Sequence, residues 1–439
     1  MKSPFISVVI LCVLTLSGNL AAEDPNSGKP LSFRTVIELA LRNGSASAVN
    51  HADLGRARAT LTEARDQFLP SMTVGSALGY SNGFPLSLEG LAPSLFNVNI
   101  QEPLFSAAQR EYIKAAKSDA EATAAQNADR RNSLIMETAM AYMQLDLLDS
   151  SLTVQKEQLE TAAKFQNIAN LRVEAGLDNR VSLMRAKLAV AKTRLDIART
   201  NSAADQLRQR LSQLTGLPAS SIHTSTETIP LLPSVSDEDD LAGEAVTRNP
   251  AVWAAEKLAV AKEFKARAER KQQYPTLDIA GQYAVLAKYN NYTKFFQPGS
   301  FQRNNLSMGV VIRFPFLNPA LHAAGDVARF DALKARGEAR AVKEQVSAEV
   351  LKLQRSVQEL SAARDVAQLE HQLAESEIEI TLAKIESGEA SLKDEQNARV
   401  AEHERYTAYL SSSFDLDKAQ VQLLRQTGDL ETWALGPRR

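Results

Sequence analysis

The sequence contains very little cysteine, proline and glycine. Its only cysteine, Cys12, lies in an apolar N-terminal segment, so the rest of the chain has no thiol for a disulfide or a metal thiolate. The 439 residues include only 16 prolines and 19 glycines. Because these two residues interrupt helices and strands, their scarcity favours a few very long elements over several compact domains.

A strong net charge and the common catalytic motifs are also missing. The net charge is −2, with 50 Lys and Arg against 52 Asp and Glu, which gives no electrostatic support for nucleic-acid binding. We find no Gly-rich phosphate loop, no nucleophile elbow and no paired histidines on one helix turn. The five histidines are scattered and are expected to be solvated: His51, His223, His322, His371 and His403. The sequence therefore predicts neither an enzyme nor a metal or cofactor site.

Residues 1–22 have the pattern of a secretory signal peptide. Lys2 precedes an apolar run from Phe5 to Leu16, and small residues lead to Ala22 before the first acidic residues. We expect cleavage after Ala22 and export of the remaining chain. No later stretch has the roughly 18 consecutive apolar residues of a membrane-spanning helix.

Short stretches of the sequence recur about 205 to 212 residues further along, which indicates an internal duplication. Arg42-Asn43 returns as Arg248-Asn249, and Thr215-Gly216 returns as Thr427-Gly428. A Pro- and Ser-rich stretch separates the copies and reads as a linker. The predicted organisation is a signal peptide (1–22), a first repeat (23–216), a linker (217–240), a second repeat (241–430) and a C-terminal tail (431–439).

Each repeat is predicted to be mostly helical. One opening helix is expected in each, over 34–68 and about 241–273, and each should end before a proline. Long proline-free helices are expected over about 106–171 and 320–384, followed by return helices over about 181–214 and 392–425. The first return helix carries apolar residues at the alternating spacing of a coiled-coil seam. They are Met184, Leu188, Ala191, Leu195 and Ala198.

Between the helices, each repeat has two stretches in which apolar and polar residues alternate. Four such stretches, each about ten residues long, match the length of a tilted strand that crosses a bilayer. The apolar set, predicted to face lipid, is Val74, Leu78, Val98, Ile100, Ile279, Tyr283, Met308 and Val310. The intervening set, predicted to face water, includes Thr73, Asn97, Asn99, Gln282 and Ser307.

Alternation alone is equally typical of a soluble hairpin, but export and aromatic residues near the loops favour a membrane barrel. The aromatic residues are Tyr80, Phe84, Tyr289, Tyr292, Phe295, Phe296 and Phe301. Four strands cannot close a barrel, and lipid requires every strand edge to be paired. The barrel must therefore be shared among several chains.

Several short motifs follow one another along the chain: Leu31–Asn43, Phe68-Leu-Pro70, Pro103-Leu-Phe105, Arg172–Leu177, Leu214-Thr-Gly216, Phe314-Pro-Phe316 and Asn397-Ala-Arg399. Their order and spacing, from about Leu31 to Leu430, resemble those of the outer-membrane efflux proteins, the TolC-like family. The resemblance implies a mainly α fold with a small β part. Long antiparallel coiled-coil helices would form a periplasmic α-barrel, and four strands per chain would contribute to a twelve-stranded outer-membrane β-barrel in a homotrimer.

The resemblance also implies partners and sites. A periplasmic adaptor protein would bind the helix tips, at Arg172, Gly176, Leu177, Gly388 and Ser391, and would link the channel to an inner-membrane pump or transporter. The family's acidic ring near the narrow end has two aspartates three residues apart, and the matching residues here are Asp394 and Asn397. The polar side chains that lock the closed tip in the family are matched by Val181, Ser182, Ile385 and Ala390, so no lock is evident.

Two alternatives to an export channel fit the sequence less well. A periplasmic adaptor would have one helical hairpin and no repeat of this length, and a coiled-coil scaffold would not explain four alternating strands at matched positions. Drug, metal and protein export fit the sequence equally well, because the pump selects the cargo.

Overall fold

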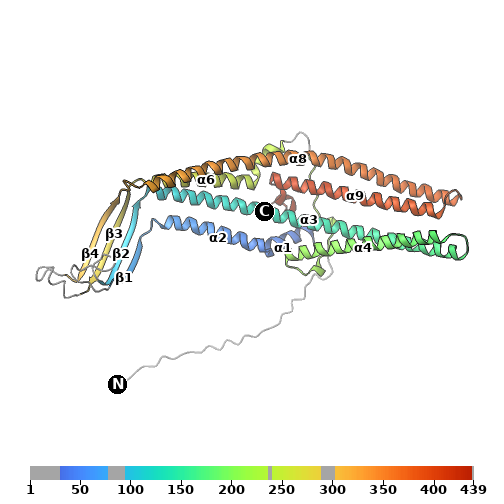
Figure 1. Ribbon diagram of the computed structural model, residues 1–439, viewed down its shortest axis with the longest axis horizontal. Helices are drawn as coiled ribbons and strands as arrows, with labels where there is room; N and C mark the ends of the chain where they lie inside the picture. The colour runs from blue at the N-terminus through green and yellow to red at the C-terminus, as the bar shows by residue number, and fades with distance from the viewer. Residues whose placement is uncertain (1–29, 78–93, 236–239, 288–301, 438–439) are drawn as a thin grey trace, which may run out of the picture.

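The computed structural model describes residues 30–77, 94–235, 240–287 and 302–437. The chain is an elongated molecule with a four-stranded sheet at one end and the tips of two helical hairpins at the other (Figure 1). The predicted signal peptide lies outside the described residues. So do Leu78 and all of the predicted loop aromatics, namely Tyr80, Phe84, Tyr289, Tyr292, Phe295, Phe296 and Phe301.

The same order of elements occurs twice, which confirms the mainly α fold with a small β part. The first copy consists of α1 (Phe33–Asn43), α2 (Ser45–Asp66), β1 (Ser71–Ala77), β2 (Ser94–Phe105), α3 (Ala107–Glu174) and α4 (Arg180–Thr215). Two short 3-10 turns follow, η1 (Ala219–Ser221) and η2 (Thr226–Thr228). The second copy consists of α5 (Leu241–Arg248), α6 (Pro250–Lys271), β3 (Thr276–Leu286), β4 (Asn304–Arg313), α8 (Pro319–Glu386) and α9 (Leu392–Thr427). A short helix, α10 (Leu430–Leu435), ends the described chain.

The prediction of one opening helix per repeat was wrong, because each is broken in two. In the second copy, Pro250 lacks an N–H and forces the preceding Asn249 into an extended conformation, with ψ at 123°. In the first copy Gly44 makes the break, with ψ at 138°. Both breaks place an asparagine side chain on the end of a return helix. Asn43 donates to the Thr215 carbonyl and Asn249 donates to the Gln426 carbonyl, each at 2.9 Å.

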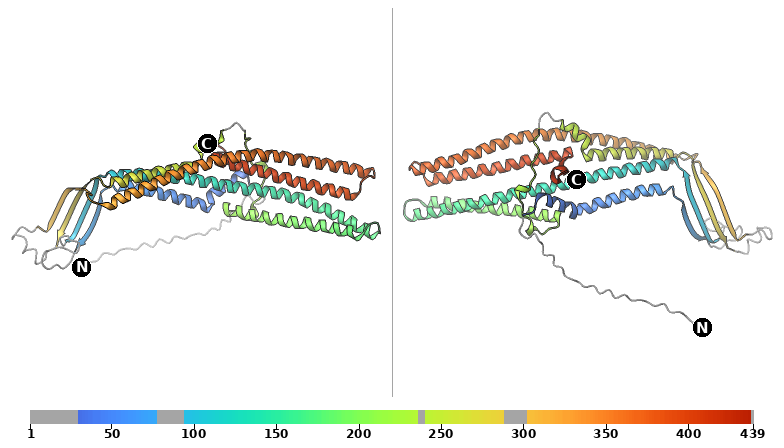
Figure 2. Two further views of the ribbon diagram at one scale, coloured as in Figure 1. Left: turned by 45° about the horizontal axis from the view of Figure 1, so that its top comes forward. Right: turned by 180° about the vertical axis from the view of Figure 1, so that it is seen from behind.

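The long helices were predicted correctly, and they form one curved layer (Figures 1 and 2). α3 and α8 have 68 residues each, which corresponds to a length on the order of 100 Å at 1.5 Å per residue. Toward the tips, the layer runs in the order α8, α9, α3 and α4; toward the sheet, it runs α8, α6, α3 and α2. One outer edge of the layer is therefore α8, and the other edge is α2 followed by α4.

The largest hydrophobic core lies near the middle of the molecule, where α1, α3, α4, α9 and α10 meet. The ring of Phe33 packs in T-shaped arrangements against Tyr142 and Trp433, with ring centroids 5.4 and 5.3 Å apart. The buried Tyr142 hydroxyl donates to the Leu31 carbonyl at 2.7 Å. A second core, which includes Val350 and Leu423, joins α5, α6, α8 and α9. These two cores hold the helices together, and the helices carry the sheet at one end of the molecule and the helix tips at the other. Within the described ranges, no helix is long and apolar enough to span a membrane.

Candidate functional site

The register of the sheet separates an apolar face from a polar face. The strands are antiparallel in the order β1-β2-β3-β4, and residues opposite one another in such a sheet share a face. Val74 pairs with Val98, Val98 with Tyr283, and Tyr283 with Leu306. All seven described residues of the set predicted to face lipid therefore lie on one face. They are Val74, Val98, Ile100, Ile279, Tyr283, Met308 and Val310.

This apolar face is open to the surroundings of the chain. Val74, Val310 and Met308 are 58%, 61% and 76% exposed. A monomeric soluble protein rarely leaves such a continuous apolar surface uncovered.

The opposite face of the sheet is polar. Thr73 pairs with Asn99, Asn99 with Gln282, and Gln282 with Ser307. At the helix end of this face, the buried carboxylate of Asp278 accepts hydrogen bonds from Arg313 at 2.6 Å and from Gln101 at 3.2 Å. The sequence analysis did not identify this ion pair. The sequence feature that could have predicted this ion pair is the presence of opposite charges at the polar positions of two consecutive strands.

The outer strands of the sheet are β1 and β4, and each pairs with another strand on one side only within the described residues. Their outward N–H and C=O groups form the kind of edge that pairs with another strand. Where β4 leads into α8, Phe314, Phe316 and Leu317 are 68%, 97% and 87% exposed. Membrane barrels carry girdles of aromatic residues where the membrane meets water.

At the opposite end of the molecule, the two helix tips have the same backbone geometry. Gly176 and Gly388 have φ of +73° and +79°, which favours glycine because a side chain is strained there. The N–H of Leu177 donates to the Arg172 carbonyl and that of Glu389 to the Lys384 carbonyl, both at 2.8 Å. This is the Schellman pattern that ends a helix.

The exposed groups of the predicted adaptor-binding residues differ between the tips. In the first tip Leu177 is 68% exposed, and Arg172 forms an ion pair with Asp178 at 3.0 Å. In the second tip the exposed Ser391 caps the start of α9. The structure thus places the five residues predicted to contact an adaptor at one end of the molecule.

Asp394 has a local partner at the start of α9. Its carboxylate accepts hydrogen bonds from the N–H and the hydroxyl of Ser391, at 2.9 and 2.6 Å. These two bonds hold the pKa of Asp394 below its ordinary value. Asn397 lies three residues further along and is exposed, as Asp394 is. Asp394 therefore stabilises the first turn of α9, and its role in a pore stays a prediction.

The predicted seam on α4 is left exposed by the described residues of the chain. Met184, Leu188 and Leu195 are 67%, 56% and 49% exposed, and the two alanines between and after them are exposed too. Instead, α4 packs through residues on its other side, including Ala186, Val190 and Thr193, which are buried. The expectation of a seam came from spacing alone, and spacing does not identify the helix that covers it.

Two histidines are less solvated than expected. The imidazole of His371 on α8 is 3.0 Å from the Glu402 carboxylate of α9 and packs against Tyr406, with ring centroids 4.9 Å apart. His403 is partly buried, and burial lowers its pKa. The described part of the chain contains no cluster of three or more side chains suited to hold a metal ion.

The comparisons with known proteins agree with this geometry. Residues 36–217 match the sequence profile of the outer membrane efflux protein family. The fold is shared with the CmeC outer membrane channel of Campylobacter jejuni, with a TM-score of 0.75 at 16% identity, covering 91% of this chain and 86% of that one. It is also shared with the outer membrane protein VceC of Vibrio cholerae, with a TM-score of 0.73 at 19% identity, covering 90% and 96%.

The first half of the chain thus resembles the outer membrane efflux protein family, and the chain has the fold of outer membrane channels. Its sequence is also 25% identical over 296 residues to Protein CyaE of Bordetella pertussis, over 66% of this chain and 60% of that protein's length. The chain is located in the outer membrane, with its helices in the periplasm. The matched family profile and the fold are those of outer membrane efflux channels, which are not enzymes.

Proposed function

We propose that three copies of this chain form a channel through the outer membrane and a helical tunnel across the periplasm. The tunnel receives substrates from an inner-membrane pump or transporter through a periplasmic adaptor protein. The observation that carries this proposal is the four-stranded sheet with one exposed apolar face, one polar face and two open edges.

The open edges support a ring of copies. A closed barrel with a filled interior needs about eight strands, and a water-filled one needs more, so one chain supplies too few. The β1 edge and the β4 edge differ from one another, and each continues into a different edge of the helical layer. A ring in which β1 of one copy pairs with β4 of the next leaves no open edge. Three copies make a twelve-stranded barrel with its apolar face toward lipid and its polar face toward water.

A mass measurement tests the assembly. In detergent, mass photometry of the purified protein should give the mass of three chains. A monodisperse monomer would overturn the proposal and would favour the scaffold alternative.

Labelling of single cysteines tests the orientation of the sheet, because Cys12 is the only cysteine in the sequence. In intact outer membranes, a water-soluble maleimide should label Ser307→Cys and should not label Val310→Cys. These two positions lie three residues apart on β4 and on opposite faces of the sheet. Equal labelling of both would contradict the assignment of the apolar face to lipid.

The helix tips support binding of an adaptor. Two similar turns lie at the same end of the helical layer, and their exposed groups are those of Arg172, Gly176, Leu177, Gly388 and Ser391. Leu177→Glu should weaken binding of the adaptor in a pull-down while leaving the trimer intact. Undiminished binding would exclude this residue from the contact.

Near the narrow end of the tunnel, Asp394 would form a ring of three carboxylates in the trimer. Like charges at short range are stabilised by cations between them, as in other charged pore rings. In planar bilayers, Asp394→Asn should lose cation selectivity and block by divalent cations added from the periplasmic side. Asn397→Ala is the matched control and should keep both. Unchanged selectivity and block in trimeric Asp394→Asn would limit Asp394 to its local role at the start of α9.

A further inference from the structure

An open cavity of about 580 Å³ lies near the sheet, where α3 runs between α2 and α6. Sites for small molecules commonly have volumes of about 300 to 1,000 Å³, so the cavity is large enough for one. Small apolar side chains from all three helices line part of it, namely Ala64, Ala115, Ala116 and Ala261. The cavity therefore offers an apolar surface to a molecule that carries a ring.

Three glutamines lie at the end of the cavity nearest the sheet. Gln67, Gln109 and Gln272 are each four residues from the end of a strand, β1, β2 and β3 respectively. The Gln109 amide donates to the Ala64 carbonyl of α2 at 2.6 Å, and the Gln272 amide donates to the Tyr112 hydroxyl of α3 at 2.5 Å. These two bonds tie α3 to both of its neighbours, so the cavity is formed without a ligand.

Four charged side chains line the cavity, and none of their charged groups forms an ion pair or a hydrogen bond with any described residue. They are Glu63 on α2, Asp119 on α3, and Lys262 and Lys265 on α6. Elsewhere α3 and α6 do pair their charges. Glu121 lies 2.7 Å from Lys257, and Glu111 lies 2.8 Å from Lys271. The unpaired charges are therefore a feature of the cavity and not of these helices in general.

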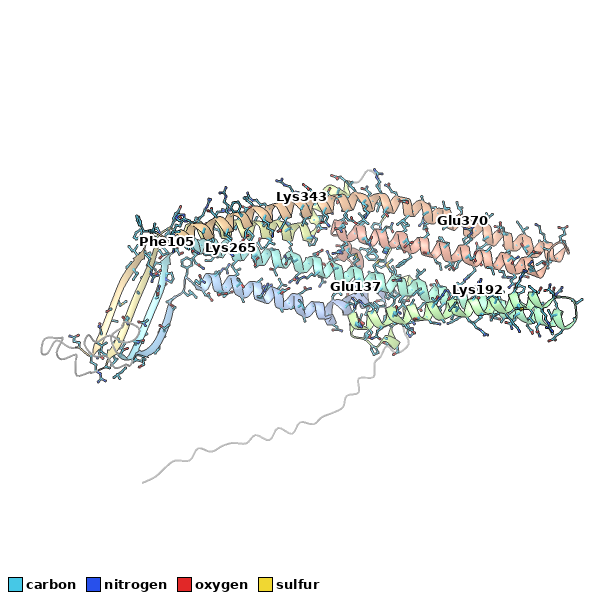
Figure 3. The ribbon with its side chains drawn as sticks, viewed as in Figure 1. Phe105, Glu137, Lys192, Lys265, Lys343 and Glu370 are labelled. Carbon is cyan, nitrogen blue, oxygen red and sulfur yellow. The ribbon has the colours of Figure 1, made fainter. Side chains whose placement is uncertain are left out.

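The two signs of charge lie on different walls of the cavity. The lysines belong to α6 and Glu63 belongs to α2, on opposite sides of α3. Figure 3 shows Lys265 near the sheet end of the helical layer. A ligand with a single charge would meet groups of its own sign on one wall, whereas a ligand with both charges meets opposite charges on each.

We propose that this cavity binds a small zwitterionic solute. Its acidic group pairs with Lys262 and Lys265, and its cationic group pairs with Glu63 and Asp119. These charges fix the direction in which the solute lies across α3.

The part of the cavity between the charges is neutral. Burial and the Glu269 carboxylate raise the pKa of Tyr112 to about 12, so its phenol carries no charge at neutral pH. Its ring and the four alanines provide the surface against which the middle of the solute packs. Aromatic rings prefer other rings as neighbours at about 4.5 to 7 Å between centroids, so an aromatic solute suits this surface.

The cavity opens on the side of the helical layer that continues the polar face of the sheet. Arg110 of α3 packs on the ring of Phe105, 5.0 Å from its centroid, and Phe105 pairs with Leu277 on the apolar face. At about 100° per residue, Tyr112 and Asp119 lie roughly 160° and 180° around α3 from Arg110. The view that a solute reaches the cavity from inside a channel rests on the proposed function, which this site deepens by naming a class of solute.

Three ligands of similar size test the choice of charge. The dipeptide phenylalanyl-phenylalanine is a zwitterion at about pH 6.5, its N-acetyl derivative carries only the carboxylate, and its C-terminal amide carries only the ammonium group. In isothermal titration calorimetry of the protein in detergent, corrected for detergent alone, the dipeptide should bind roughly tenfold more tightly than either derivative. Equal binding of all three, or no binding of the dipeptide, would overturn the proposal.

Single substitutions test the pairing of each charge. Lys265→Gln should weaken binding of the dipeptide roughly tenfold and should not weaken binding of the amide, which has no carboxylate. Glu63→Gln should weaken binding of the dipeptide and should not weaken binding of the N-acetyl derivative. Lys343→Gln is the matched control, because Lys343 is an exposed lysine of α8 away from the cavity (Figure 3). Loss of amide binding in Lys265→Gln, with dipeptide binding intact, would overturn the proposed orientation.

Filling the cavity provides an independent test. Ala116→Trp places a large side chain among the lining residues and should abolish binding of the dipeptide. Far-UV circular dichroism checks that the variant is folded. Undiminished binding to folded Ala116→Trp would exclude this cavity as the site.

The cavity is formed within one chain, so failure of the site is distinguishable from failure of the proposed assembly. A protein that is trimeric by mass photometry but does not bind the dipeptide retains the assembly and loses the site. A monomer that binds the dipeptide retains the site and loses its place in a channel.

Discussion

The two return helices, α4 and α9, have the same length, begin with a capped first turn and end at an αL glycine, but they lie in different surroundings. Each has 36 residues. α9 lies between α8 and α3, whereas α4 lies at the edge of the layer, against α3 alone among the long helices. Asp205 of α4 is 75% exposed and pairs with Arg208, but its repeat equivalent, Asp417 of α9, is partly buried.

The difference shows what the duplication preserved and what it did not. The positions that end and cap the helices stayed the same, because both copies need the same backbone. The outward surfaces diverged, because one helix has neighbours on both sides and the other is left for a partner. An apolar stripe flanked by basic residues is thus found on the edge helix, α4, whereas three of the five equivalent positions of α9 are polar, namely Gln396, His403 and Thr407.

The largest expected effect concerns a position at which the two helices are alike. Leu211 and its repeat equivalent, Leu423, are both buried, in different hydrophobic cores. Leu→Ala at either position should lower the free energy of unfolding by about 2 to 5 kcal/mol. The two losses can be measured by guanidinium unfolding in detergent, followed by far-UV circular dichroism. A negligible loss at one of them would show that the two cores are not equivalent.

Replacing Asp205 or Asp417 with asparagine should have different effects on stability, because Asp205 is exposed and Asp417 is partly buried. Burial raises the pKa of Asp417 to about 6, although Arg364 opposes the shift. The folded chain then holds this proton more tightly than the unfolded chain does, so the free energy of unfolding falls as the pH rises from about 4 to about 6. Asp417→Asn should therefore stabilise the chain at pH 7 by roughly 1 to 3 kcal/mol, with no gain below pH 4. The exposed Asp205→Asn should change stability by less than about 0.5 kcal/mol at either pH. A pH-independent gain at Asp417 would exclude titration as its cause.

Replacing the glycine that ends each helix with alanine should lower stability by different amounts in α4 and α9. Gly216 and Gly428 have φ of +78° and +87°, so alanine is strained at both, by about 1 to 2 kcal/mol. A Cβ at Gly428 would also lie 3.1 Å from the Arg248 carbonyl oxygen, whereas the nearest atom at Gly216 is 3.6 Å away. Thermal unfolding should thus show a larger decrease for Gly428→Ala than for Gly216→Ala. The reverse order would contradict this account.

The smallest effect is expected at the first turns. Asn179 accepts a hydrogen bond from the Ser182 N–H at 3.0 Å, and Ser391 occupies the equivalent position in α9. Asn179→Ala and Ser391→Ala should each cost about 1 kcal/mol, since each removes a residue that caps a helix. Unfolding curves measured side by side provide the comparison. A loss at one tip only would show that the two tips are stabilised differently.

Much of the fold could be predicted because the decisive signals are local. The absence of proline over more than sixty residues predicted α3 and α8, and strict alternation predicted the four strands and their two faces. The breaks at Gly44 and Asn249 were missed, because a helical apolar pattern continues across both. In the second case Pro250 was the available signal, since a proline restricts the residue before it.

Less of the candidate site could be predicted, because it depends on which helices are neighbours. His371 was expected to be solvated, but its contact with Glu402 depends on the alignment of α8 with α9. The seam on α4 was recognised from its spacing, but the sequence did not show that α4 lies at an edge. Similarly, the role of Asp394 at the start of α9 depends on the position of the Ser391 hydroxyl.

The unlike edges of the chain have a genetic consequence. In the proposed ring of three copies, each contact would use the α4 edge of one copy and the α8 edge of its neighbour. A copy with a damaged α4 edge and an intact α8 edge still enters a ring with normal copies and weakens one contact of three. Coexpression of such an allele with the normal gene should therefore produce mixed rings with graded stability, and its phenotype should be partly dominant. Two alleles damaged on opposite edges would still form sound contacts where their intact edges meet.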